Sequence, residues 1–235
     1  IKTCRVTRVT TESVQEFLGE VKLMAPLSHP NLVRLYGGCW SDGPDKLCIV
    51  LELCIKGTLK DLLVATEDHK LIEHDWAHPF YKITSGIASC FRYFHHEQAS
   101  GEALIHRDLK SDNVMLAQDY QAKVGDLGES TRFDVEKAKS RLAETEDANI
   151  NVLNLTMTSV GTPVYSAPEI LLCEPYNQTV DQYSFAIMCL EVGCRDHNFV
   201  VQQIGRSGRF ANISVASGGK GFRPRPTAVF EAAQP

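Results

Sequence analysis

The chain has 235 residues, of which 43% are hydrophobic and 23% charged, and its formal net charge is −5 at pH 7. This length and composition exclude a wholly disordered chain, and the acidic balance argues against nucleic-acid binding, which needs clustered Lys and Arg. Because there is no apolar run of about 18 residues and no signal-peptide pattern, we expect no membrane segment within the chain. The eight Cys lack CxxC spacing and most lie in apolar runs, which is typical of free thiols in a reducing compartment.

The N-terminal part of the chain predicts strands and one helix. The β-branched residues of 1–10 favour a strand. Over 11–27 the apolar side chains recur at helical spacing, and Pro26 ends this predicted helix. The members of its apolar face are Val14, Phe17, Leu18, Val21 and Met24. The runs "VRLYGGCW" and "KLCIVLELC" then predict two strands joined by the turn "SDGPD".

The rest of the chain predicts mostly helix. An apolar stripe over 76–96 indicates a long helix, and "VDQYSFAIMCLEVG" is apolar almost all round, which is typical of a central buried helix. Between these helices, "LIHRDLKSDNVML" and "QAKVGDLG" combine short apolar runs with polar turns. The polar, acidic stretch 129–158 predicts a long mobile loop. The change of character near "LELCIKG" indicates two lobes, formed by residues 1–54 and 55–235.

The charged cluster "HRDLKSDN" is the strongest functional signal. Asp108 and Asn113 lie in a turn between apolar runs, and Asp126 follows the next apolar run. Carboxylate and amide oxygens are hard ligands that suit Mg²⁺, an ion that itself binds substrate phosphate. A neighbouring Lys supplies positive charge for a transferring phosphoryl group, and an Asp can accept the proton of an attacking hydroxyl. For each residue alone a solvated turn is the more frequent explanation, but the ordered set favours catalysis. By contrast, we expect His95 and His96 to be structural, because adjacent helical residues point about 100° apart and make poor joint metal ligands.

Several motifs, in order along the chain, resemble those of eukaryotic protein kinases. "HRDLKSDN" resembles the catalytic loop, "DLG" the DFG motif and "SAPE" the APE motif. "IK" at residues 1–2 resembles the end of the VAIK strand, and "FLGEVKLMAPLSHPNLVRLYG" resembles the regulatory helix with the strand after it. "DQYSFAIM" resembles the helix whose Asp braces the catalytic loop. The resemblance implies an α+β, bilobal protein-kinase-like fold, with an incomplete N-terminal β lobe over 1–54 and a mainly helical C-terminal lobe over 55–235.

The resemblance also implies catalytic and metal-binding roles. Asp108 would be the catalytic base that orients the substrate hydroxyl, and Lys110 would contact the γ-phosphate of ATP. Asn113 and Asp126 would hold Mg²⁺.

For the nucleotide, Lys2 would hold the α- and β-phosphates, positioned by Glu20. The residues implied at the adenine pocket are the gatekeeper Leu51, the backbones of Glu52 and Cys54, and Met115. A stacked spine between the lobes would consist of Met24, Leu35, His106 and Leu127.

Two features indicate the kind of kinase. Lys110, two residues after Asp108, follows the serine/threonine pattern, and Thr162 of "GTPVYSAPE" is expected to bond to both of them. "HPNLVRLYGGCW", "HRDLKSDN" and the late "GFRPRP" resemble the tyrosine-kinase-like group. The implied function is a protein serine/threonine kinase in signalling, which transfers the γ-phosphate of ATP to Ser or Thr of protein substrates and uses ATP and Mg²⁺.

The hydroxyl-rich segment between "DLG" and "SAPE" suggests control by phosphorylation. Arg107 lies directly beside the proposed base, and kinases with this Arg are commonly switched by a phosphate in that segment. We expect an upstream kinase or autophosphorylation to modify Thr156, Thr158 or Ser159, with Arg132 completing the phosphate pocket.

The chain departs from the family pattern at both ends. No Gly-rich loop precedes Lys2, and no helices follow "GFRPRP", so we expect a kinase domain truncated at both ends that is inactive and marginally stable as printed. Inside the domain, Glu129 and Ala186 replace a usual apolar residue and a usual Gly. The alternative function is a pseudokinase-like scaffold that binds partners without chemistry, but retention of Lys2, Asp108 and Asp126 favours the enzyme. We expect a cytoplasmic location, and a membrane-anchored receptor context outside this segment stays open.

Overall fold

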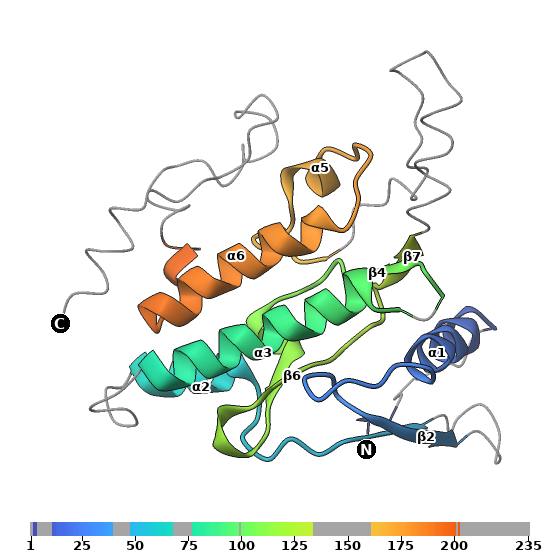
Figure 1. Cartoon of the computed structure of the whole chain (residues 1–235), viewed down its shortest axis with the longest axis horizontal. Helices are drawn as coiled ribbons and strands as arrows, with labels where there is room; N and C mark the ends of the chain where they lie inside the picture. Colours follow the sequence, from blue (N-terminus) through green and yellow to red (C-terminus); the bar gives the residue numbers. More distant parts are fainter. Residues whose placement is uncertain are drawn as a thin grey trace.

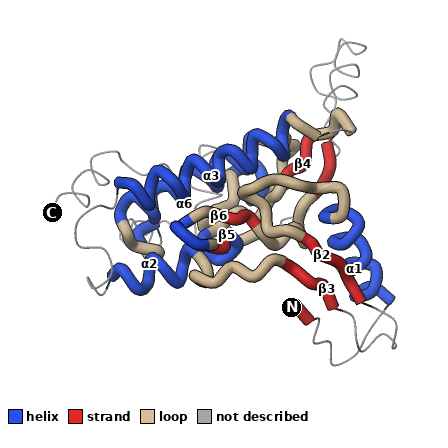
Figure 2. The backbone as a smooth tube through the Cα atoms, turned by 60° about the horizontal axis from the view of Figure 1, so that its bottom comes forward, coloured by secondary structure: helices blue, strands red, loops and turns tan. Residues whose placement is uncertain are grey.

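The computed structural model describes residues 2–3, 11–39, 48–67, 77–98, 100–133, 161–200 and 202 (Figure 1). Strand β2 lies beside helix α1 at one end of the molecule, whereas α2, α3 and α6 gather at the other (Figure 2). Most of the predicted strand over 1–10, the turn "SDGPD" and most of the predicted loop over 129–158 lie outside the described residues. None of the described helices is long and apolar enough to cross a membrane.

The described part of the small lobe is an antiparallel sheet packed against one helix. The strands are β1 (Lys2–Thr3), β2 (Leu35–Cys39) and β3 (Cys48–Leu51), in the order β1-β3-β2. Helix α1 (Thr11–Met24) buries Phe17 in one cluster with Ile49 of β3. The helix ends two residues before Pro26, because the residue before a proline disfavours the helical conformation. The predicted helix and the predicted strand pair are therefore confirmed, and the described strand of 1–10 is two residues long.

Helices build the large lobe. They are α2 (Leu59–Glu67), α3 (Ala77–His96), α5 (Pro168–Leu171) and α6 (Thr179–Cys194). α3 and α6 run side by side (Figure 1). Ile83, Ile87 and Phe94 of α3 share one core with Met188 and Val192 of α6, and all five are fully buried. Each such burial contributes about 1.5–3 kcal/mol, so the predicted apolar faces hold the two helices together.

Four short strands and the turns that connect them lie between α3 and α5 in the chain. They are β4 (Ala103–Ile105), β5 (Val114–Leu116), β6 (Ala122–Val124) and β7 (Thr131–Phe133). β5 and β6 form an antiparallel hairpin, and β4 pairs with β7. The prediction of a loop throughout 129–158 is wrong for β7. Its hydrogen-bonding partner is distant in sequence, so local polarity gave no sign of the strand.

A hydrogen-bonded joint connects the segment after α1 to β6. Val33 donates its N–H to the carbonyl of Val124 at 2.8 Å, and Val124 donates back to the carbonyl of Asn31 at 2.8 Å. His29 stacks on Tyr93 of α3, with ring centroids 5.2 Å apart, and its Nδ1 accepts the N–H of Asn31 at 3.1 Å. That acceptor role requires a neutral ring, and burial lowers the pKa of His29 accordingly. The joint places the end of β6, and the residues that follow it, at the boundary of the lobes.

Candidate active site

The turn after β4 is held through its main chain. Both oxygens of Asp181 accept backbone N–H groups at 2.9 Å, Oδ1 from Arg107 and Oδ2 from His106. His95 Nε2 also donates to Oδ2 at 2.8 Å, and Asp181 is fully buried. These bonds fix a turn in which Arg107 has a φ of +69°, and they agree with the predicted bracing Asp and with a structural role for His95.

His106 links this turn to the residue before Asp126. Its ring is fully buried, and Nε2 donates to the carbonyl of Gly125 at 3.1 Å. Its Nδ1 faces the N–H of Asp108 at 3.3 Å, which requires the proton to sit on Nε2. Of the expected spine, Met24 and Leu127 share one core with Leu35 packed against it, and His106 packs beside Phe94 of that same core.

Asp108 is the centre of the polar cluster. Oδ1 accepts the N–H and the Oγ1–H of Thr162, at 2.9 and 3.0 Å. Oδ2 accepts Lys110 Nζ at 2.7 Å and Asn113 Nδ2 at 3.0 Å. Lys110 Nζ also donates to Thr162 Oγ1 at 2.9 Å, so the expected contact of Thr162 with both residues is present. The Asp108 side chain is 11% exposed, which leaves the carboxylate reachable in a fixed orientation.

Asn113 precedes β5 and Asp126 follows β6, so both lie at the open end of the β5–β6 hairpin. Asn113 immediately precedes β5, and its carbonyl accepts the N–H of Gly125 at 2.9 Å. Because Asp126 is the next residue, the hairpin brings these two chain segments together. The Asn113 amide donates its NH₂ to Asp108, so its oxygen is left to face away from that carboxylate. One exposed carboxylate and one amide oxygen form a donor set that suits a hard divalent cation.

The segment 161–166 presses against the turn that holds Asp108. Gly161 has a φ of +89°, and a Cβ added there would lie 2.6 Å from the carbonyl oxygen of Arg107. Only glycine allows this approach. Further along, the Tyr165 N–H and the Ser166 Oγ both bond to the carbonyl of Thr162, at 2.9 and 3.0 Å, which folds the segment into a compact loop.

A second buried polar cluster includes Tyr165 of this loop, and it was not predicted from the sequence. The hydroxyl of Tyr165 lies 2.9 Å from both oxygens of Glu191 and 3.2 Å from Ser111 Oγ. Burial raises the pKa of Glu191 to about 8 and also raises that of Tyr165. One sign of this cluster was present in the sequence, because Glu191 is a carboxylate inside an otherwise apolar helix. A carboxylate is buried in such a place only when it has hydrogen-bonding partners.

The residues expected around a nucleotide lie near the first strands. Leu51 ends β3, and Glu52 and Cys54 follow it in the connection to α2. This connection runs beside β5, since Leu116 donates its N–H to Gly57 and Thr58 bridges to Met115. Met115 is thereby placed beside Thr58, four residues after Cys54.

The two residues expected at the phosphates are only partly described. The backbone of Lys2 pairs with Ile49, but its side chain lies outside the described residues. The expected ion pair with Glu20 of α1 is therefore untested. A different ion pair occurs here: Lys123 of β6 lies 2.8 Å from the Glu52 carboxylate, and sequence reasoning did not find it.

Arg107 has neutral partners. Its Nε donates to the carbonyl of Glu129, and NH1 donates to the hydroxyl of Tyr176 at 3.2 Å. Arg132, expected beside it, instead donates to Ser100 Oγ at 3.2 Å. The three expected phosphorylation positions, Thr156, Thr158 and Ser159, lie outside the described residues.

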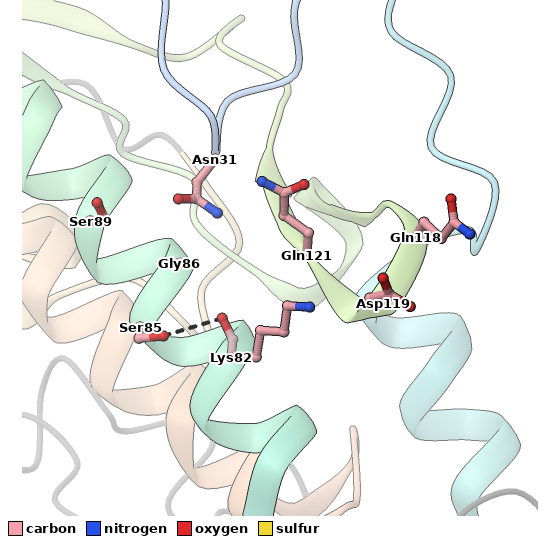
Figure 3. A pocket seen from close by; sticks show the side chains of 8 residues that line it. All are labelled: Asn31, Lys82, Ser85, Gly86, Ser89, Gln118, Asp119 and Gln121. Atoms are coloured by element: carbon pink, nitrogen blue, oxygen red, sulfur yellow. Dashed lines mark hydrogen bonds between the residues drawn. The ribbon is translucent and has the colours of Figure 1, made fainter.

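A separate hollow of about 610 Å³ lies between α3 and the turn after β5 (Figure 3). Its walls are polar and come from α3, from that turn and from the segment after α1. They consist of Asn31, Lys82, Ser85, Gly86, Ser89, Gln118, Asp119 and Gln121. None of these is a predicted site residue, so the hollow lies outside the candidate active site.

This fold and this arrangement around Asp108 are those of a protein kinase. The chain belongs to the protein kinase domain family, whose profile matches residues 1–215. It is 33% identical over 185 residues to a probable L-type lectin-domain containing receptor kinase S.7 of Arabidopsis thaliana, covering 79% of this chain and 24% of that protein. It is 34% identical over 215 residues to a probable serine/threonine-protein kinase of Dictyostelium discoideum, covering 91% of this chain and 14% of that protein.

A third relative is the probable serine/threonine-protein kinase drkC of Dictyostelium discoideum. The identity is 32% over 193 residues, covering 80% of this chain and 23% of that protein. The chain thus spans less than a quarter of the length of these three relatives. The predicted kinase fold is confirmed, and the predicted serine/threonine kinase class agrees with the names of these relatives. A kinase domain of this family uses ATP and a divalent metal in general.

Proposed function

We propose that the intact protein transfers the γ-phosphate of ATP to Ser or Thr hydroxyls of protein substrates in signalling, as a member of the tyrosine-kinase-like group. The observation that supports this most is the Asp108 carboxylate, which is held by Lys110 and Thr162 and is still reachable. In this arrangement Asp108 is the base that orients the acceptor hydroxyl and takes its proton. Lys110 contacts the transferring phosphate, and Thr162 holds both residues in register.

Asn113 and Asp126 would hold Mg²⁺, which supplies positive charge to the phosphate oxygens. On the nucleotide side, the residues proposed to bind ATP are Lys2, Glu20, Leu51, Glu52, Cys54 and Met115. Residues 1–54 form the small lobe and 55–235 the large lobe in this proposal. The nucleotide lies between them, where the joint at β6 brings Asp126 to the boundary.

Control is proposed to act through Arg107. Its two neutral partners, Tyr176 and the Glu129 carbonyl, hold the guanidinium close to the catalytic turn. A phosphate on Thr156, Thr158 or Ser159, added by an upstream kinase or by autophosphorylation, would give this guanidinium an anionic partner beside its neutral ones. The domain is proposed to act in the cytoplasm, and the receptor kinases among its relatives make a membrane anchor elsewhere in the protein compatible with this location.

The test is Asp108→Asn in the intact protein, with Asp112→Asn as the matched control in the same loop. Asp112 pairs with Lys60 at 2.9 Å and is 43% exposed. We expect Asp108→Asn to lower kcat for peptide phosphorylation by about 10²–10⁴-fold while the Kd for Mg·ATP changes little, because a general base contributes about this factor. The control should stay within about threefold of the wild type, the scale of a surface ion pair.

Full phosphotransfer by Asp108→Asn would contradict the assigned base. A wild-type protein that binds Mg·ATP but phosphorylates no peptide would instead favour the pseudokinase-like scaffold.

A further inference from the structure

The hollow beside α3 is built by three parts of the chain that are far apart in the sequence (Figure 3). Its volume of about 610 Å³ lies within the ~300–1,000 Å³ that is usual for ligand pockets. Such pockets are lined mainly by apolar and aromatic side chains, whereas all the side chains around this hollow are polar. A molecule that fits it is therefore polar along most of its surface.

A positive and a negative group lie on opposite walls of the hollow. Lys82 is half-buried, and its side chain extends from α3 toward the turn that carries the exposed Asp119 (Figure 3). Neither residue forms an ion pair within the part of the chain that the structure describes. Because salt screens a partly buried charge less than an exposed one, Lys82 is well placed to attract an anion. The two groups favour a ligand that carries one charge of each sign.

The turn between β5 and β6 holds Asp119 in place. Ala117 donates its N–H to the carbonyl of Gln121 at 2.9 Å, which closes the turn. Asp119 has a φ of +55°, in the left-handed region that Asp adopts more readily than most residues. Its carboxylate is therefore presented to a ligand on a closed, hydrogen-bonded turn.

The amide groups around the hollow have a defined orientation. Asn31 Nδ2 donates to the carbonyl of Ala122 at 2.9 Å, so Oδ1 is the atom left to accept a hydrogen bond from a ligand. Gly86 of α3 makes room for this amide, since a Cβ at Gly86 would lie 2.6 Å from Asn31 Nδ2. Gln121 is oriented in the same sense, because its Nε2 donates to the carbonyl of Pro30 at 3.2 Å. Both amides thus offer their oxygens as acceptors.

Ser89 of α3 adds a donor. His29 accepts the N–H of Asn31 at Nδ1, so its ring proton lies on Nε2, which is 3.3 Å from Ser89 Oγ. Nε2 therefore donates to that oxygen, and the hydroxyl hydrogen of Ser89 stays available for an acceptor. Lys82 and Ser89 are seven residues apart and share one face of α3. The α3 wall thus supplies donors, whereas the opposite wall supplies acceptors.

We propose that this hollow binds a small zwitterion of up to tripeptide size, with its carboxylate on Lys82 and its ammonium group on Asp119. The peptide groups of such a molecule supply N–H donors for Asn31 and Gln121 and carbonyl acceptors for Ser89. At about 30 Å³ per water the hollow holds about 20 waters, the space of a molecule with a similar number of non-hydrogen atoms. Binding here is independent of the proposed kinase function, because none of these residues is assigned to the nucleotide, the metal or the acceptor.

Calorimetric titration of the intact protein with glycine, diglycine and triglycine tests the length of the ligand. We expect at least one of these zwitterions to bind with a Kd below about 1 mM. Triglycine amide lacks the carboxylate and N-acetyltriglycine lacks the ammonium group, but both keep the triglycine backbone. Each of these two molecules should bind at least about tenfold more weakly than triglycine, because each loses one charge-assisted hydrogen bond.

Two variants test the assigned partners. Lys82→Met and Asp119→Asn should each raise the Kd about tenfold, whereas Lys22→Met, at an exposed lysine of α1, should leave it unchanged. Hydrogen exchange gives a second readout, since the bound zwitterion should slow amide exchange over 29–33 and 118–124 in the wild type.

The inference would be overturned by three results: no binding of any of the three zwitterions, equal affinity for the molecules that lack one charge, or an unaltered Kd in Lys82→Met. It would also be overturned if an end-capped peptide with Glu and Arg side chains bound more tightly than triglycine. That result would assign the hollow to a segment of a partner protein.

Discussion

The catalytic turn and the 161–166 loop rest on the same helix but are attached to it differently. Asp181 holds the catalytic turn through the backbone N–H groups of His106 and Arg107. The 161–166 loop is held to the helix by one main-chain and one side-chain bond of Tyr165, since its carbonyl accepts Ser184 Oγ at 2.8 Å and its hydroxyl reaches Glu191. The first attachment does not depend on which side chains the turn carries, whereas the bond to Glu191 in the second requires a tyrosine at position 165.

This difference shows two kinds of support for the proposed active site. Because the catalytic turn is fixed by its main chain, the side chains of Arg107 and Asp108 are not needed to hold it and stay available for the roles proposed for them. The neighbouring loop bonds to Asp108 through Thr162, so a change at Tyr165 or Glu191 is expected to reach Asp108 through that residue.

The largest expected effect follows from Asp181→Ala. It leaves three donors without their acceptor: His95 Nε2 and the His106 N–H, which are buried, and the part-buried Arg107 N–H. At about 1–3 kcal/mol for each such group, the free energy of unfolding should fall by more than about 3 kcal/mol. Chemical denaturation measures this, with Gln182→Ala as the exposed neighbouring control. A loss equal to that of the control would show that the main-chain attachment does not support the turn.

Thr162→Val should have the next largest effect, on activity. Valine keeps the shape and the N–H bond to Asp108 but removes the hydroxyl that joins Asp108 to Lys110. We expect kcat to fall about 10–100-fold, because both groups lose their common partner. Thr162→Ser retains the hydroxyl and should stay within about threefold of the wild type. Steady-state kinetics that gave the same kcat for Val and Ser would refute a role for the hydroxyl.

The attachment of the 161–166 loop should also depend on pH. The pKa of Glu191 is raised from 4.5 to about 8, so between these values the folded chain holds a proton that the unfolded chain releases. Its contribution to stability is complete below pH 4.5 and is lost as the pH rises toward 8, at up to about 1.4 kcal/mol per pH unit. The groups that face it are Tyr165, Asp112 and Asp196. Urea denaturation across this range should give a flatter profile for Glu191→Gln than for the wild type, and parallel profiles would contradict the buried neutral form.

The smallest expected effect concerns an attachment at the surface. Lys60 of α2 pairs with Asp112 of the catalytic loop, and their side chains are 42% and 43% exposed. A double-mutant cycle with Lys60→Ala and Asp112→Ala should give a coupling energy below about 1 kcal/mol. A larger coupling would mean that exposed side chains also anchor the catalytic loop.

Sequence patterns were sufficient where the cause of structure is local or the motif is compact. The apolar face of α1 and the buried character of α6 follow from side-chain periodicity, and the bond of Thr162 to Asp108 and Lys110 was anticipated from the motifs. The expectation that Asp181 braces the catalytic loop agrees with the geometry, and so does the structural role of His95.

Features that depend on distant pairing were not predictable in the same way. β7 forms because Thr131–Phe133 pair with Ala103–Ile105. The polar sequence around β7 contains no pattern that indicates this pairing. Glu52 and Lys123 are 71 residues apart, and Tyr165 and Glu191 are 26 apart. Arg132 was expected beside Arg107, but in the β4–β7 ladder it pairs with Leu104 and its guanidinium reaches Ser100. The lone carboxylate at 191 was visible in the sequence, but its partner was not.

A side chain at position 161 would disrupt the contact between the 161–166 loop and the catalytic turn. A methyl group there would meet the Arg107 carbonyl oxygen at 2.6 Å, on a backbone with a φ of +89° that other residues avoid. Gly161→Ala would force the two loops apart without changing any residue proposed to bind the nucleotide. Such a variant would show whether the proposed transfer of phosphate depends on the contact between these two loops.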